Sequence, residues 1–177
     1  MADLFAELHR RHPDVDLVIL PPSPPPADVP QADDDVVAAA FSDVARATRQ
    51  VWATVVPDGT AQPRTRWSYA ADPGRVQPVG RVVERRADGF HLLVGLRHEL
   101  EGNGWAVTRP AGAVERLTGR LDDLTLTASY AEATGVLLLT VSHEPLVVGP
   151  QRAVALVRPT PTPAPRRDGD DPVGGER

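Results

Sequence analysis

The chain of 177 residues contains neither cysteine nor lysine. Without cysteine it cannot form a disulfide, a thiolate nucleophile or a cysteine-ligated metal site. Without lysine it lacks the ammonium group of phosphate-binding loops, Schiff-base chemistry and lysine general bases. Alanine, valine, proline and aspartate are abundant, and arginine replaces lysine throughout. We interpret this composition as the codon bias of a high-GC bacterium.

Long apolar runs are also missing. No segment approaches the roughly 20 apolar residues that a membrane span requires, and residues 1–11 contain no apolar run of signal-peptide length. The sequence therefore predicts no membrane span and, by default, a cytoplasmic protein.

The net charge of −5 is unevenly distributed. Residues 1–63 carry four arginines and ten acids, whereas residues 64–120 carry ten arginines and six acids. A basic middle region can indicate nucleic-acid binding. The overall acidity and the interspersed acids argue against it, so no nucleic-acid partner is predicted.

Composition divides the chain into four parts. Residues 1–20 are expected to form a short helix followed by a strand, and residues 21–34 form a proline-rich linker. Residues 35–157 are expected to form one α+β domain. Residues 158–177 contain mainly proline, threonine, glycine and charged residues, which predicts a disordered tail.

Two helices are predicted in the domain. Apolar residues spaced by three or four positions indicate one helix from about residue 35 to Val55, with Asp33, Asp34 or Asp35 as its N-cap. The second helix begins near Asp88 and ends at 102–104. Residues 65–71 are predicted as a strand, and 79–86 are compatible with either a strand or a helix.

The C-terminal half predicts a meander of strands. Leu124, Leu126, Ala128 and Tyr130 alternate with Thr125, Thr127 and Ser129, which indicates a strand with one apolar and one polar face. Residues 136–141 form an apolar strand, and 153–157 are expected to add an edge strand. The predicted fold is α+β, with an antiparallel sheet of four to five strands and two helices packed on one face.

The five histidines are the first candidates for a catalytic or metal-binding site. His98 and Glu101 have a spacing compatible with two metal ligands, but a structural zinc site needs four and a catalytic one three. Ser142, His143 and Glu144 are adjacent on a strand and so cannot converge as a triad. We predict no catalytic residue, no cofactor and no metal ligand.

The leading functional hypothesis is a non-enzymatic protein-interaction module of the adaptor, chaperone-like or immunity type. Its predicted contact residues are Val15, Val18 and Leu20, on a short strand flanked by prolines that could pair with a protein partner or form a homodimer. Two alternatives remain. One is a small-molecule or lipid-binding domain with an apolar pocket between helices and sheet, and the less favoured one is a hydrolase using His98 and His143.

Overall fold

A computed structural model describes residues 10–11, 29–110 and 114–158. In the last two ranges a seven-stranded sheet packs against three α-helices. The helices are α2 (Asp34–Val55), α3 (Gly89–Gly102) and α4 (Pro150–Val157). The strands are β1 (Arg64–Tyr69), β2 (Arg75–Arg85), β3 (Ala106–Thr108), β4 (Glu115–Leu121), β5 (Leu124–Ala131), β6 (Val136–His143) and β7 (Leu146–Val147), with a 3-10 turn, η1 (Glu132–Thr134), between β5 and β6.

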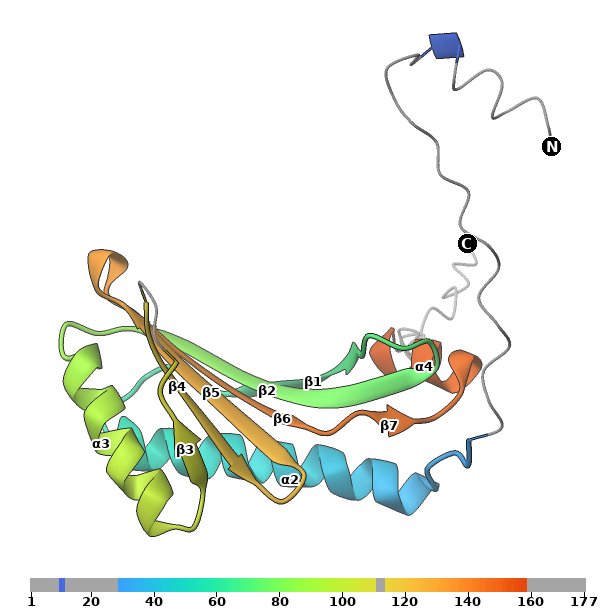
Figure 1. Ribbon diagram of the computed structural model, residues 1–177, viewed down its shortest axis with the longest axis horizontal. Coiled ribbons are helices and arrows are strands. Elements are labelled where there is room, and N and C mark those ends of the chain that lie inside the picture. Colours follow the sequence, from blue (N-terminus) through green and yellow to red (C-terminus); the bar gives the residue numbers. More distant parts are fainter. Residues whose placement is uncertain (1–9, 12–28, 111–113, 159–177) are drawn as a thin grey trace, which may run out of the picture.

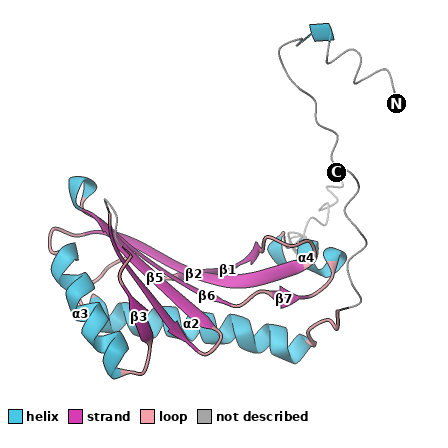
Figure 2. Cartoon of the chain, in the orientation of Figure 1, coloured by secondary structure: helices cyan, strands magenta, loops and turns pink. Residues whose placement is uncertain are grey.

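All strand pairs are antiparallel, in the order β1-β2-β6-β5-β4-β3, and β7 pairs with the start of β2. The sheet curves over α2, with α3 at the β3–β4 end and α4 near β1 (Figure 1). Figure 2 shows α2 along one face of the sheet, with α3 and α4 at its two ends. The buried strand residues point to the face that the helices cover, and the opposite face is the open face.

The sequence of α2 explains how it covers the sheet. Its buried residues recur at intervals of three and four, which places them on one side of a helix; they are Val37, Ala40, Val44, Thr48 and Trp52. The predicted helix is thus confirmed, with its C-terminal end at Val55. The side chain of Asp33 makes no capping hydrogen bond. The carboxylate of Asp34 accepts a hydrogen bond from the side chain of Arg152 of α4.

A glycine lets α2 approach β2 closely. A Cβ placed on Gly80 would lie 2.0 Å from the Oγ1 of Thr48. Thr48 is fully buried, and its hydroxyl donates a hydrogen bond to the Val44 carbonyl. The hydrogen bond satisfies the buried Thr48 hydroxyl, and the close approach leaves no space for a larger residue at position 80.

The start of α3 is fixed by an aromatic ring. A Cβ on Gly89 would lie 2.2 Å from Cδ2 of Tyr130, so the first turn of α3 rests directly on that ring. The Tyr130 hydroxyl donates to the Arg86 carbonyl at 3.1 Å. This anchor brings Leu93, Leu96 and Leu100 of α3 into the main core, where they pack with Trp105.

The predicted edge strand at 153–157 is wrong, because these residues belong to helix α4. Gly149 adopts a positive φ of 79°, which glycine tolerates, and Pro150 follows at the first helical turn, where proline's missing N–H costs nothing. Ala153 then packs with Val37, Val76 and Val148 in a second, smaller core. A five-residue apolar segment is compatible with either a helix or a strand, so the sequence of 153–157 alone does not decide between them.

The α+β class and the antiparallel sheet are confirmed, but the predicted counts of four to five strands and two helices are too low. Residues 79–86, which were compatible with either element, lie almost entirely in strand β2, which ends at Arg85. Strands β3 and β7 have three and two residues, too few for alternation to show. The described part of the predicted linker includes Ala32, whose N–H donates to Val147 of β7 at 2.7 Å.

Candidate functional site on the open face of the sheet

The strand register identifies the residues of the open face, because directly paired residues point to the same side of a sheet. Arginine and hydroxyl side chains dominate it. Its arginines are Arg64, Arg66, Arg75, Arg81, Arg85, Arg116 and Arg120, and its hydroxyl residues are Ser68, Thr108, Thr118, Thr125, Thr127, Ser129, Thr140 and Ser142. The larger apolar residues of this face are Val79, Val83, Val136, Leu138 and Val147.

The described strands contribute no carboxylate to this face. The carboxylates of Glu84 and Glu115 belong to the other side, as their pairing with Leu137 and Tyr130 shows. The Glu84 carboxylate accepts hydrogen bonds from the backbone N–H groups of Thr60 and Ala61. The open face is therefore uniformly positive in a chain whose net charge is negative.

Six of the seven arginines form no ion pair with any described residue; they are Arg64, Arg66, Arg81, Arg85, Arg116 and Arg120. Arg75 contacts Asp72 at 3.6 Å. All six are exposed. Arginines elsewhere do find carboxylates, for example Arg97 with Glu101. Among the described arginines outside the open face, only Arg49 and Arg158 also lack an ion pair, so unpaired arginines are concentrated on this face.

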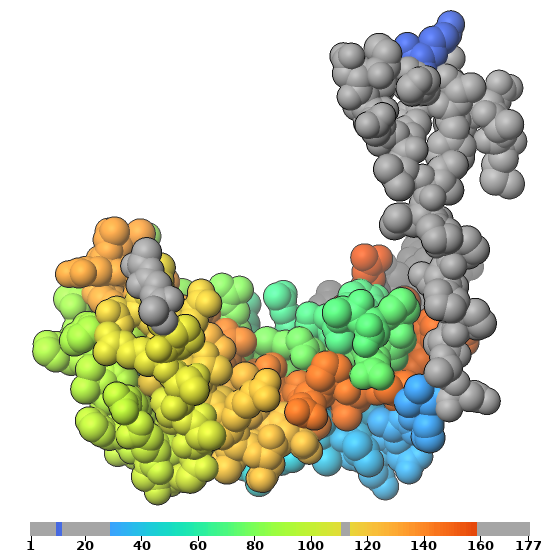
Figure 3. Space-filling model, viewed as in Figure 1, coloured from blue at the N-terminus to red at the C-terminus, as the bar shows by residue number. Residues whose placement is uncertain are grey.

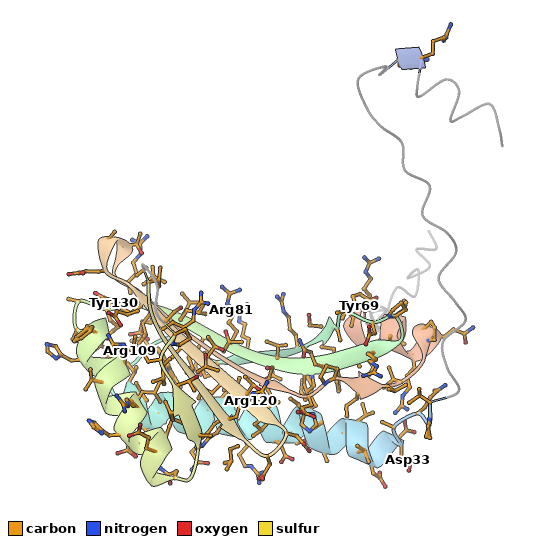
Figure 4. The ribbon with its side chains drawn as sticks, viewed as in Figure 1. Asp33, Tyr69, Arg81, Arg109, Arg120 and Tyr130 are labelled. Carbon is orange, nitrogen blue, oxygen red and sulfur yellow. The ribbon has the colours of Figure 1, made fainter. Side chains whose placement is uncertain are left out.

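The densest part of the face is a cluster of Arg64, Arg66 and Arg81. Arg64 and Arg81 are directly opposite each other on β1 and β2, and Arg66 is two residues further along the same face. Like charges in directly opposed positions destabilise a sheet. The three side chains line a hollow of about 330 Å³ together with Gln62. Figure 4 shows Arg81 pointing away from α2.

Hydroxyl groups connect this cluster to the far side of the sheet. One row of paired residues runs from Thr118 through Thr127 and Thr140 to Arg81 and Arg64. The described open-face positions include no aromatic side chain: Trp67 and Tyr130 both point to the helix side. The surface offers guanidinium groups and hydroxyls, which bind oxygen anions, but no ring on which a base could stack.

A second feature, on the opposite side of the molecule, is a groove of about 420 Å³ between α2, α3 and the β4–β5 turn. Its apolar lining includes Val51, Leu96, Trp105 and Leu124. It agrees in position with the pocket between helices and sheet that the alternative hypothesis requires. Its rim is polar, with Asp43, Arg46, Gln50 and Glu99.

The histidines do not assemble into a site. His91 and His98 are exposed on α3, and Glu101 beside them is paired with Arg97. His143 is partly buried at the end of β6, where its Nδ1 lies 2.8 Å from the Glu144 carbonyl and its Nε2 lies 3.9 Å from Asp123. Within the described ranges no three His, Cys, Asp or Glu side chains are grouped closely enough to hold a metal ion.

The predicted contact residues Val15, Val18 and Leu20 lie outside the described residues. Sequence analysis missed the arginine face, although two signals for it were present. Residues 64–120 have an excess of arginine, and Arg64 and Arg66 share one face of a strand, as do Arg116 and Arg120. Only the pairing register of the strands shows that these arginines lie on the same face of one sheet.

The chain matches no protein-family model and no curated protein. Among solved structures it is similar to the "putative lipoprotein LppA from Mycobacterium tuberculosis", at 13% sequence identity and a TM-score of 0.38. The alignment covers 67% of this chain and 81% of that chain. A similarity this weak carries no inference about function or location. None of the described helices is both long and apolar enough to cross a membrane.

Proposed function

We propose that the protein is a non-enzymatic protein-interaction module that binds an acidic partner protein on the open face of its sheet. The observation that carries the proposal is the set of six exposed arginines on that face, none paired with a carboxylate of the described residues. The helices leave this surface uncovered, and its charge is opposite to that of the chain as a whole.

The energetics favour a ligand for this surface. The directly opposed Arg64 and Arg81 repel each other in the free protein, and an acidic partner would convert that repulsion into attraction. A guanidinium group can donate two parallel hydrogen bonds to one carboxylate. Each such contact is stronger than a neutral hydrogen bond, so three clustered arginines can supply a binding centre.

An acidic protein fits better than a nucleic acid. The described positions of the open face lack the aromatic residues on which single-stranded bases stack. A protein partner can present a few carboxylates at short range. The row of threonines can accept and donate hydrogen bonds to its polar groups.

The test measures binding of polyglutamate, as a generic acidic polypeptide, to the full chain at low ionic strength. We expect Arg81→Glu to weaken binding about tenfold or more, since one attractive contact becomes repulsive. The matched control is Arg49→Glu, an equal change of charge at an exposed position of α2. Equal losses in both variants would show general electrostatics and would contradict the proposal. Stronger binding of single-stranded DNA of equal charge at the same arginines would contradict it as well.

The groove between α2 and α3 supports a second candidate, a small-molecule or lipid-binding function. Its volume of about 420 Å³ is within the range of ligand pockets. Titration with a fluorescent fatty acid tests it. Binding that is lost in Val51→Arg, inside the groove, and retained in Val94→Arg, exposed on α3, would favour this function; no saturable binding would reject it.

A further inference from the structure

One edge of strand β1 has no partner strand among the described residues. The other edge of β1 pairs with β2. An unpaired edge presents N–H and C=O groups to which another strand can bind. Proteins use such edges to capture extended segments of their partners.

Two chemically different surfaces flank this edge. On the open face lie the guanidinium groups of Arg64 and Arg66, two residues apart. A groove of about 470 Å³ follows β1; its apolar wall consists of Trp67, Phe41 of α2 and Leu156 and Val157 of α4, and Arg66 and Ser68 of the open face also line it. The rings of Phe41 and Trp67 are 5.6 Å apart and form part of its wall.

A strand added here would present alternate residues to these two surfaces, because successive side chains of a strand point to opposite faces. Residues of one parity would meet the arginines, and those of the other parity would meet the apolar groove. We infer that β1 binds an extended segment of the partner protein in which acidic and apolar residues alternate. This inference rests on the proposed function and specifies how the acidic partner is recognised.

Main-chain pairing also explains why the partner is a polypeptide. The edge of β1 that has no described partner strand can hydrogen-bond only to a ligand with regularly spaced amide groups, and a nucleic acid has none. The arginines alone would attract any anion. The edge, the arginines and the groove together select a peptide in which acidic and apolar residues alternate.

The experiment measures binding of a labelled, end-blocked peptide, Glu-Val-Glu-Val-Glu-Val, to the full chain by fluorescence anisotropy. The double variant Arg64→Glu/Arg66→Glu should weaken binding by about tenfold or more. The variant Arg116→Glu/Arg120→Glu makes the same change on the same face, on β4; it should weaken binding of polyglutamate, but it should change the affinity of this short peptide by about twofold or less, because β4 lies beyond a Debye length from β1. Unfolding curves confirm that both variants are folded.

N-methylation of the peptide separates strand addition from simple charge attraction. Methylating one alternate set of amides should abolish binding and methylating the other should not, because only one set faces the edge of β1. Equal binding of both methylated peptides would overturn the inference. If both double variants weaken the peptide and polyglutamate equally, the inference fails while the proposed function stands. If polyglutamate does not bind at all, the proposed function itself fails.

A second copy of the chain is the competing occupant. The segment Asp14–Leu20 of this second copy alternates acidic and apolar residues, with acids at positions 14 and 16 and apolar residues at 15, 17 and 19. A peptide affinity that decreases as protein concentration rises, together with a dimeric mass in light scattering that Arg64→Glu/Arg66→Glu reduces to a monomer, would overturn the assignment to a separate partner.

Discussion

The two faces of the sheet come from the same strands and yet have opposite chemistry. On β5, Leu126, Ala128 and Tyr130 are buried against the helices, whereas Thr125 and Thr127 point to the open face. On β2, Val76, Pro78 and Val82 are buried, whereas Arg81 and Arg85 are exposed. In the space-filling view the strands of the open face remain accessible from above (Figure 3). The helix-covered face contains the buried core, and the helices leave the open face uncovered.

The two faces also differ in whether their arginines form ion pairs. On the helix side and in the loops most described arginines contact a carboxylate, and only Arg49 and Arg158 do not; Arg86, for example, contacts Asp58 at 3.1 Å and Asp88 at 2.9 Å. On the open face only Arg75 does so among the described residues. A sheet selected only for stability would place acids beside Arg64 and Arg81, because opposite charges in paired positions stabilise a sheet. Cross-strand stability therefore does not account for the six arginines that lack an ion pair among the described residues.

The largest difference between the faces should come from a core truncation. Leu126→Ala, at a fully buried position, should cost about 2–5 kcal/mol, since it removes packed atoms and leaves a cavity. Leu138→Ala, at a half-buried open-face position, should cost about half as much or less. Thr127→Ala should cost about 1 kcal/mol or less. Urea unfolding measures all three, and equal costs at Leu126 and Thr127 would show that the open face is covered in solution.

The contact between α2 and β2 provides the next effect. Gly80→Ala should cost about 1–3 kcal/mol, because its Cβ would overlap the Thr48 hydroxyl. Gly95→Ala is the control, since a Cβ there meets no atom within 4 Å; this helical change should stabilise by about 0.5–1 kcal/mol. Thr48→Ala should recover part of the loss in a Gly80→Ala background. Purely additive unfolding energies in the double variant would contradict the close contact.

The contrast between these elements also shows what sequence can predict. The stripe on α2 and the alternation on β5 are long enough to define both element and face, and both predictions are correct. The strand β2 was ambiguous because Pro78 and Gly80 are unfavourable strand residues, and it is Thr48 of a distant helix that makes glycine necessary. Helix α4 depends on the positive φ of Gly149 and on packing against Val37 and Val76.

The candidate site was harder to predict than the fold. Arg64 and Arg81 are 17 residues apart in sequence and become neighbours only through the register of β1 and β2. Whether these arginines lack an ion-pair partner depends on the positions of all the acidic residues in the described chain. Periodicity within one strand gives its faces, but it does not identify the neighbouring strand. A surface made of several strands is therefore visible only once their order is known.

Removing one arginine of the opposed pair should have a smaller effect on stability, with the opposite sign. Arg81→Thr should raise the free energy of unfolding by up to about 0.5 kcal/mol, because it relieves the repulsion from Arg64 and places a β-prone residue in the strand. The gain should shrink as salt screens the charges. The same variant should bind polyglutamate more weakly. A variant that loses stability at low salt would indicate that the arginines have a compensating partner.

The smallest expected effect is a difference in stability between variants of two adjacent arginines. Arg85 lies on the open face, whereas the side chain of Arg86 donates hydrogen bonds to Asp88 and Asp58. The Arg86 guanidinium donates hydrogen bonds to the Asp88 carboxylate and so holds the pKa of that carboxyl below its ordinary value of 3.8. A carboxyl whose pKa is lowered by folding stabilises the protein above its unfolded pKa, and that contribution disappears as pH falls through the folded pKa. At neutral pH, Arg86→Gln should therefore slightly lower the unfolding midpoint, whereas Arg85→Gln should leave it unchanged. The difference between the two variants should vanish below the lowered pKa of Asp88. Midpoints measured from neutral to acidic pH provide the check, and a difference that persists in acid would show that Arg86 acts through packing and not through its ion pair.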